Sequence, residues 1–102
     1  YQMYGKQWGK MLNAKLPSGT YYLSIDVDSF DPSVLPDTGT PEPGGFQWYE
    51  TIEFLRAFIS RKDIKIVGFD VVELSPSKLF TPSSFITAKL VYKVIGLIAK
   101  KM

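Results

Sequence analysis

Acidic side chains gather at two points in this 102-residue sequence, and each point follows a run of strand-forming residues. Asp26, Asp28 and Asp31 come at and after the end of the run over residues 20–27, and Glu73 ends a later run. Aspartates that alternate along a strand point to one side of it, so we expect Asp26 and Asp28 to project together, about 6–7 Å apart along the strand. Carboxylates that close repel each other unless a cation or a proton lies between them. The spacing therefore indicates a site for a hard divalent ion such as Mg²⁺, Mn²⁺ or Ca²⁺.

Other interpretations of these aspartates remain open. Asp26 and Asp28 could instead cap the following loop by accepting hydrogen bonds from its backbone amides. A calcium loop of the EF-hand type is excluded, because its third acidic position falls on Phe30 and its glycine position on Asp31. A glycosidase-like pair of carboxylates is conceivable, although nothing else in the sequence indicates a sugar site. Asp31 precedes Pro32, and we expect it to brace the turn.

Glu73 adds a further carboxylate. It ends a strand that should lie parallel to the first, so we expect it at the same sheet edge as the aspartates, where ligand sites of open α/β sheets collect. A strand-end acid can also be simply solvated, and Asp70, deeper in the strand, is expected to be paired structurally. The loop over residues 38–45 (TGTPEPGG) brings backbone amides and the hydroxyls of Thr38 and Thr40 near this edge. It matches neither a phosphate-binding loop nor a dinucleotide fingerprint.

The elements that must position these residues alternate between helix and strand. A loop over residues 29–45, with four prolines and three glycines, follows the first strand. A second loop, over residues 75–84, is expected to supply a Ser N-cap to the last helix. Two strands separated by a helix predict an α/β fold with a parallel pair. Apolar spacing and turn residues predict helices over 1–15, 46–60 and 85–101 and strands over 20–27 and 64–74.

Composition excludes several classes of function. The net charge of +2 is too small to indicate nucleic acid or an anionic membrane as a partner. No apolar run approaches the roughly 20 residues that span a bilayer, and a cytoplasmic location is expected. Cysteine is absent, which excludes disulfides and thiolate metal sites. Histidine is also absent, so the commonest general base and neutral metal ligand is missing.

Several segments taken together resemble the ureohydrolase family, which comprises arginases, agmatinases and related guanidino- or formimino-hydrolases. Residues 24–28 (SIDVD), followed by Asp31-Pro32, residues 38–41 (TGTP) and Gly44-Gly45, resemble one family signature. Residues 68–76 (GFDVVELSP) resemble the family's later strand, and Thr87-Ala88 opens a helix as the family's last helix does. The resemblance covers residues 20–99 in order.

The resemblance implies a three-layer αβα fold with a mostly parallel sheet, the arginase-like fold, of which residues 1–102 would be a single C-terminal βαβα portion. It also implies a binuclear Mn²⁺ site, where a metal-bridging hydroxide attacks the guanidinium carbon of the substrate and urea leaves. By position, Asp26 would bridge both manganese ions and Asp28 would bind one. Glu73, as the catalytic and substrate-binding residue, would hold the guanidinium by charge-assisted hydrogen bonds. Thr40 would line the substrate side.

The chain also departs from the family pattern. The remaining metal ligands of the family, histidines and an Asp-x-His-x-Asp cluster, precede this region, and two carboxylates alone cannot complete the binuclear site. Asp37 stands where a small residue is usual. We therefore expect the C-terminal part of a manganese-dependent amidinohydrolase, inactive alone and partnered by the missing N-terminal portion.

The resemblance favours agmatine as the substrate, from Glu42-Pro43 and residues 70–73 (DVVE). Alternatives are an arginase acting on arginine and a non-catalytic α/β module that retains the fold. A small guanidino compound is the expected ligand and a homo-oligomer the expected assembly of the complete enzyme.

Overall fold

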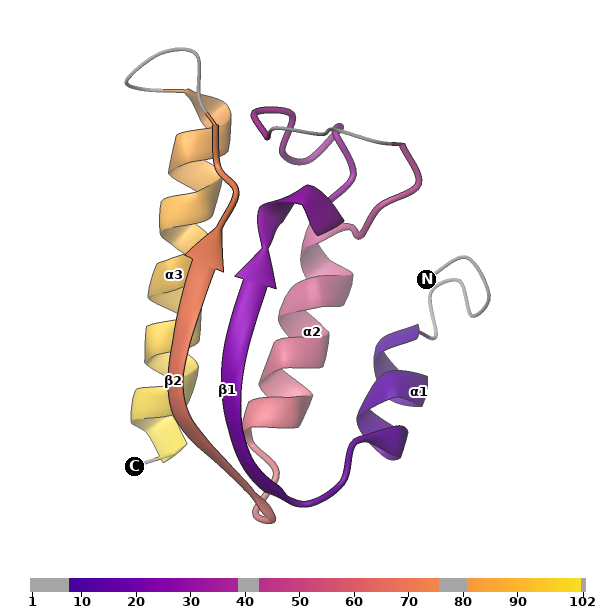
Figure 1. Ribbon diagram of the computed structural model, residues 1–102, viewed down its shortest axis with the longest axis vertical. Coiled ribbons are helices and arrows are strands. Elements are labelled where there is room, and N and C mark those ends of the chain that lie inside the picture. The colour runs from indigo at the N-terminus through magenta and orange to yellow at the C-terminus, as the bar shows by residue number, and fades with distance from the viewer. Residues whose placement is uncertain (1–7, 39–42, 76–80, 102) are drawn as a thin grey trace.

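The computed structural model describes residues 8–38, 43–75 and 81–101, and within them the chain forms a two-stranded parallel sheet with helices on one face (Figure 1). α2 follows β1 and leads back to β2, so the predicted strand–helix–strand order and the parallel pairing are confirmed. The elements are α1 (Trp8–Lys15), β1 (Gly19–Asp26), a 3₁₀ turn η2 (Val27–Ser29), α2 (Trp48–Ile59), β2 (Ile64–Val72) and α3 (Pro82–Lys101).

The sheet has one covered face and one exposed face in the described ranges. α2 and α3 pack on the covered face, and α1 packs against α2 (Figure 1). On the exposed face, Tyr22 and Val67 are 58% and 60% accessible to solvent. The described residues therefore form two layers, a sheet and one helical layer.

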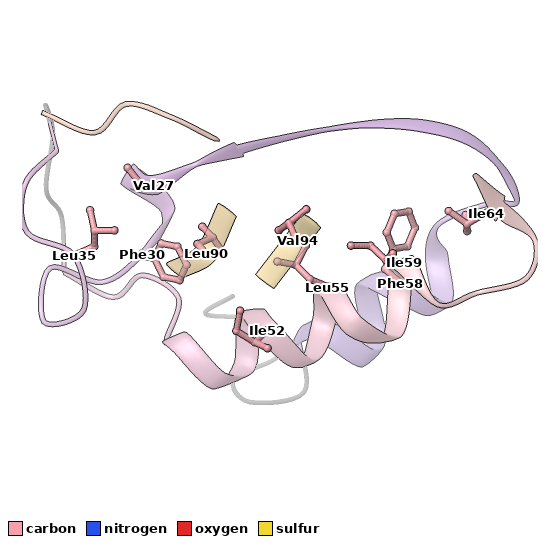
Figure 2. Packing of buried hydrophobic residues seen from close by; sticks show 10 residues of the cluster. All are labelled: Val27, Phe30, Leu35, Ile52, Leu55, Phe58, Ile59, Ile64, Leu90 and Val94. Carbon is pink, nitrogen blue, oxygen red and sulfur yellow. The ribbon is translucent and has the colours of Figure 1, made fainter. Parts of the chain in front are cut away.

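The hydrophobic core fills the space between the sheet and the helices (Figure 2). α2 places four apolar residues in it at the three- and four-residue spacing of one helix face. Val27, Phe30 and Leu35 come from η2 and the loop that follows it, so the start of this loop is fixed by burial. The core residues are Val27, Phe30, Leu35, Ile52, Leu55, Phe58, Ile59, Ile64, Leu90 and Val94.

β2 contains one more residue than β1 over the paired region. Tyr21 pairs with Ile66 but Tyr22 pairs with Gly68, so Val67 forms a bulge. Residues that pack on the core are even-numbered before the bulge, at Ile64 and Ile66, and odd-numbered after it, at Phe69 and Val71. The bulge therefore changes which face each later residue of β2 occupies, and it puts Asp70 on the exposed face with its partner Ser24.

α3 begins three residues earlier than the sequence predicts, and its N-terminal hydrogen bond comes from a threonine. Thr81 Oγ1 accepts a hydrogen bond from the backbone N–H of Ser84 at 3.1 Å, and Pro82 occupies the first helical position. A capping hydroxyl followed by proline is a strong helix start, because proline has no N–H to satisfy there. The expected Ser N-cap was wrong, and Thr87 lies in the second turn of α3 rather than at its opening.

In the described part of the chain, α3 is the one helix whose length and composition would suffice to cross a membrane. Ser83, Thr87, Leu90 and Val94 of α3 are buried against the rest of the fold, and the helix contacts α2 and β2. α3 thus packs one face on the rest of the fold and leaves the other face exposed.

Candidate active site

The C-terminal ends of the two strands bring the predicted acidic residues to one edge of the sheet. Asp26, the last residue of β1, pairs with Val72, the last residue of β2, and Glu73 follows directly. Parallel strands end on the same side, so both carboxyl-bearing residues lie at the sheet edge where α/β proteins place their ligand sites. The predicted neighbourhood of Asp26 and Glu73 is confirmed at the level of the backbone register.

The alternation argument placed Asp28 in line with the strand, but the structure shows that the strand does not continue to Asp28. β1 ends at Asp26, and Val27–Ser29 form η2. Asp26 Oδ1 accepts a hydrogen bond from the backbone N–H of Asp28 at 2.8 Å, and Ser29 Oγ donates to the carbonyl of Asp26 at 2.6 Å. These local bonds turn the chain and compete with strand continuation. Val27 consequently points into the core, and one carboxylate oxygen of Asp28, Oδ1, is shielded from solvent.

Glu73 has an unusual backbone conformation. Its φ is +73°, and it is the one non-glycine residue of the described ranges with positive φ. The left-handed region costs an L-residue with a Cβ roughly 1–2 kcal/mol, and such strain is concentrated at functional sites. The side chain is exposed at the edge of the sheet. A glutamate held in this conformation at a strand end is a candidate for ligand binding.

Asp31 organises the loop after η2, as the sequence predicted. Its carboxylate accepts hydrogen bonds from the backbone N–H groups of Ser33 and Gly44, both at 2.9 Å, and from the Ser33 hydroxyl. These bonds, with the Ser33 hydroxyl contributing most, lower the pKa of Asp31 below its ordinary value of 3.8. Asp31 therefore remains ionised as a loop brace.

The two glycines at residues 44 and 45 let the loop return against its own start. Gly44 has φ +87°, which glycine adopts without strain. A Cβ on Gly45 would lie 2.6 Å from the backbone nitrogen of Asp31 and 2.7 Å from the carbonyl oxygen of Ser29. Phe46 then bonds on both sides of Phe30, donating to the Ser29 carbonyl at 2.8 Å and accepting from the Asp31 N–H at 3.0 Å. Only glycine fits at position 45.

The loop also reaches the end of β2. Thr38 and Leu74 form an antiparallel bridge, and the Ser75 N–H donates to the Asp37 carbonyl at 2.8 Å. Asp37 N–H donates in turn to the fully buried hydroxyl of Ser83 at 3.1 Å. Residues 37 and 38 of the loop are thus tied beside Glu73 and the N-terminus of α3. The sequence did not reveal that Ser83 accepts one of these hydrogen bonds. Thr40, predicted to line the substrate side, lies outside the described residues.

A metal at this edge would find part of a ligand set. Asp26 and Asp28 offer carboxylate oxygens, which suit Mn²⁺ chemically. Among residues 8–38, 43–75 and 81–101 no group of three or more His, Cys, Asp or Glu side chains is placed to hold a metal ion. The two aspartates fit as contributors to a metal site, and further ligands must come from elsewhere.

Comparison with known proteins identifies the family of this chain. The sequence profile of the arginase family matches residues 2–96. The chain belongs to the arginase family. It is 48% identical over 79 residues to agmatinase from Pyrococcus horikoshii, covering 78% of this chain and 27% of that protein. It is 42% identical over 89 residues to N(1)-aminopropylagmatine ureohydrolase from Synechocystis sp., covering 87% of this chain and 28% of the relative.

Solved structures support the arginase-like fold. The chain superposes on proclavaminate amidino hydrolase from Streptomyces clavuligerus with a TM-score of 0.81 at 29% identity, covering 99% of this chain and 34% of that one. This arginase-family chain thus spans about a quarter to a third of the length of the proteins it matches. The fold class predicted from the sequence, a portion of an arginase-like α/β fold, is confirmed.

Proposed function

We propose that this chain supplies metal-binding and substrate-binding residues of a manganese-dependent amidinohydrolase that releases urea from agmatine or a related guanidino compound. The observation that carries the proposal is the shared end of β1 and β2, where Asp26 pairs with Val72 and Glu73 follows directly. The relatives are named agmatinase and aminopropylagmatine ureohydrolase, which favours agmatine-like substrates over arginine. The reaction adds water across the guanidinium carbon, breaks its bond to the substituted nitrogen, and yields urea and an amine.

Asp26 and Asp28 would hold the manganese through their carboxylate oxygens. Arginase-family proteins use Mn²⁺, and Mn²⁺ when bound supplies the Lewis acidity that lowers the pKa of water. η2 brings the two aspartates together by a bend rather than by strand alternation, because the Asp28 N–H bonds to Asp26 Oδ1.

Glu73 would bind the guanidinium group. A guanidinium is planar and permanently charged, and a carboxylate can accept two parallel N–H bonds from it. The left-handed backbone of Glu73 supports this role, since the fold retains the strain rather than relieving it with glycine. Thr40 would contact the substrate from the loop that Thr38 ties to the end of β2.

The test is urea release by the complete gene product that carries this sequence, loaded with Mn²⁺ and assayed on agmatine and arginine separately. Glu73→Gln should lower kcat/KM roughly 10- to 150-fold, the range for losing a hydrogen bond to a charged group. Glu53→Gln, an exposed glutamate on α2, is the matched control and should leave turnover unchanged. A Glu73→Gln enzyme as active as the control would refute the assignment of Glu73.

A non-catalytic module is the second candidate. It is favoured by the absence of histidine from the sequence and of a three-residue ligand cluster among the described residues. Calorimetric titration of the 102-residue chain with Mn²⁺ tests the hypothesis of a non-catalytic module against that of an amidinohydrolase portion. Tight binding of two ions would count against a module without a metal role, and we expect the chain alone to release no urea.

A further inference from the structure

The exposed face of the sheet carries a cross-strand cluster two residues before the acidic strand ends. It consists of Tyr22 and Ser24 on β1 and Gly68 and Asp70 on β2, and we call it the cross-strand clamp. The members pair in register, Tyr22 with Gly68 and Ser24 with Asp70. The next pair of same-facing residues is Asp26 with Val72, beside Glu73.

Asp70 is the centre of the clamp. Its Oδ1 accepts a hydrogen bond from Ser24 Oγ at 2.7 Å, and its Oδ2 accepts one from Tyr22 Oη at 3.0 Å. Both carboxylate oxygens of Asp70 therefore bond to the neighbouring strand, as expected for a structurally paired aspartate. Hydrogen bonds to an ionised acceptor are about twice as strong as neutral ones, so the carboxylate ties the two strands at two points.

Gly68 makes room for the tyrosine ring. A Cβ at Gly68 would lie 3.0 Å from Cε2 and 3.1 Å from Cδ2 of Tyr22. The ring thus lies against the backbone of β2, which lets its hydroxyl reach Asp70, two residues further on. The bulge at Val67 accommodates the extra residue of β2, so that Asp70 still pairs with Ser24 on the exposed face.

The pKa of Tyr22 depends on its hydrogen bond to Asp70 in the clamp. The hydrogen bond to Asp70 raises the pKa of Tyr22 above its ordinary value of 10.0, and desolvation and the negative charge of Asp70 act in the same direction. The phenol therefore stays protonated and donates to Asp70 throughout the neutral range.

We propose that the cross-strand clamp is a positioning device that holds Asp26, at the end of β1, and Glu73, directly after β2, at a fixed separation. The proposal rests on the proposed function, in which Asp26 binds metal and Glu73 binds the guanidinium. A misplacement of about 1 Å between catalytic groups and substrate can cost about 100-fold in rate, and the clamp joins the two strands one same-facing pair before Asp26 and Val72. Side-chain bonds one pair away from the site keep the two strand ends from sliding or fraying apart.

The first test uses this chain and does not depend on activity. Amide hydrogen exchange is measured for residues 24–26 and 70–72 in the wild type, Asp70→Ala and the control Lys65→Ala, at the opposite end of β2. Exchange at these amides should rise about tenfold in Asp70→Ala and remain unchanged in Lys65→Ala. Asp70→Asn, which keeps one carbonyl acceptor, should give an intermediate rise. Equal exchange in Asp70→Ala and Lys65→Ala would overturn the clamp.

The second test measures the consequence for the site in the complete gene product. Asp70→Ala and Tyr22→Phe should weaken Mn²⁺ binding or lower kcat by about tenfold, the lower end of the effect of losing an outer partner of a metal site. Faster exchange with wild-type manganese affinity, kcat and KM would overturn the positioning role. A wild-type protein that releases no urea would instead refute the proposed function, and hydrogen exchange would then decide the clamp alone.

Discussion

The left-handed backbone at Glu73 predicts that glycine there stabilises the fold while removing the candidate binding group. The perturbation is the pair Glu73→Gly and Glu73→Ala, which both delete the carboxylate but differ in whether a Cβ must occupy φ +73°. The left-handed region costs an L-residue roughly 1–2 kcal/mol, and glycine loses about 0.5–1 kcal/mol more than alanine in conformational freedom. At the midpoints, Glu73→Gly should be about 0.75 kcal/mol more stable than Glu73→Ala.

Urea unfolding followed by the fluorescence of Trp8 and Trp48 provides the assay, with thermal unfolding as a second measure. A difference of that size should shift Tm by roughly 3–6 °C in a domain of about this length. Val72 is the matched control, because it precedes Glu73 and has no positive φ. There the order should invert, with Val72→Gly less stable than Val72→Ala by about 0.5–1 kcal/mol. If Glu73→Ala proved as stable as Glu73→Gly, the backbone would not be strained and this argument for function would fail.

Three further predictions concern the loop and the exposed face. Gly45→Ala should destabilise the fold by about 2 kcal/mol or more in urea unfolding, because its Cβ would collide with backbone atoms. The control Gly96→Ala, which has open space around it on α3, should stabilise the fold by up to about 1 kcal/mol. Equal effects of the two substitutions would argue against the close approach at Gly45. The lowered pKa of Asp31 gives stability that is present above pH 3.8 and is lost as the pH falls through the folded-state pKa. Asp31→Asn should therefore be less stable than the wild type at about pH 6 and should approach the wild type once the pH lies below that folded-state pKa. A difference that stays constant with pH would contradict this. The raised pKa of Tyr22 gives stability that is present below pH 10.0 and is lost as the pH rises through the folded-state pKa. A pH titration of ultraviolet absorbance, taken as the difference between the wild type and Tyr22→Phe, should report that pKa. Asp70→Asn should lower the pKa of Tyr22.

Sequence patterns predicted most of the fold because strand and helix periods are local properties. The two strands, the helix that connects them and the apolar face of α2 follow from β-branched runs and from three- and four-residue spacing. The end of β1 was placed one residue late, since an aspartate that captures a nearby N–H ends a strand without any change in apolar pattern. The start of α3 was recoverable from Thr81-Pro82, a threonine followed by the residue favoured at the first helical position.

The candidate site was predictable in its residue types but not in its detailed geometry. Parallel strands require Asp26 and Glu73 to share an edge, and this needs no tertiary knowledge. The positive φ of Glu73 has no sequence signal, because glutamate is not a left-handed residue by preference. The need for Gly45 arises from segments that meet only after the loop closes. The pairing of Asp70 with two hydroxyls depends on the bulge, which a continuous apolar run conceals.

The bulge at Val67 also decides which changes of chain length β2 can accept. Deleting Val67 would leave Ile66 paired with Tyr21 and Gly68 with Tyr22, so every residue would keep its face and its partner. Deleting or inserting one residue after the bulge would instead reverse the faces of the residues beyond it, and would carry Glu73 out of step with Asp26. β2 therefore holds one spare residue, and removing it at Val67 costs no alignment at the acidic edge. Length variation among related sequences should be tolerated at this position and avoided between it and Glu73.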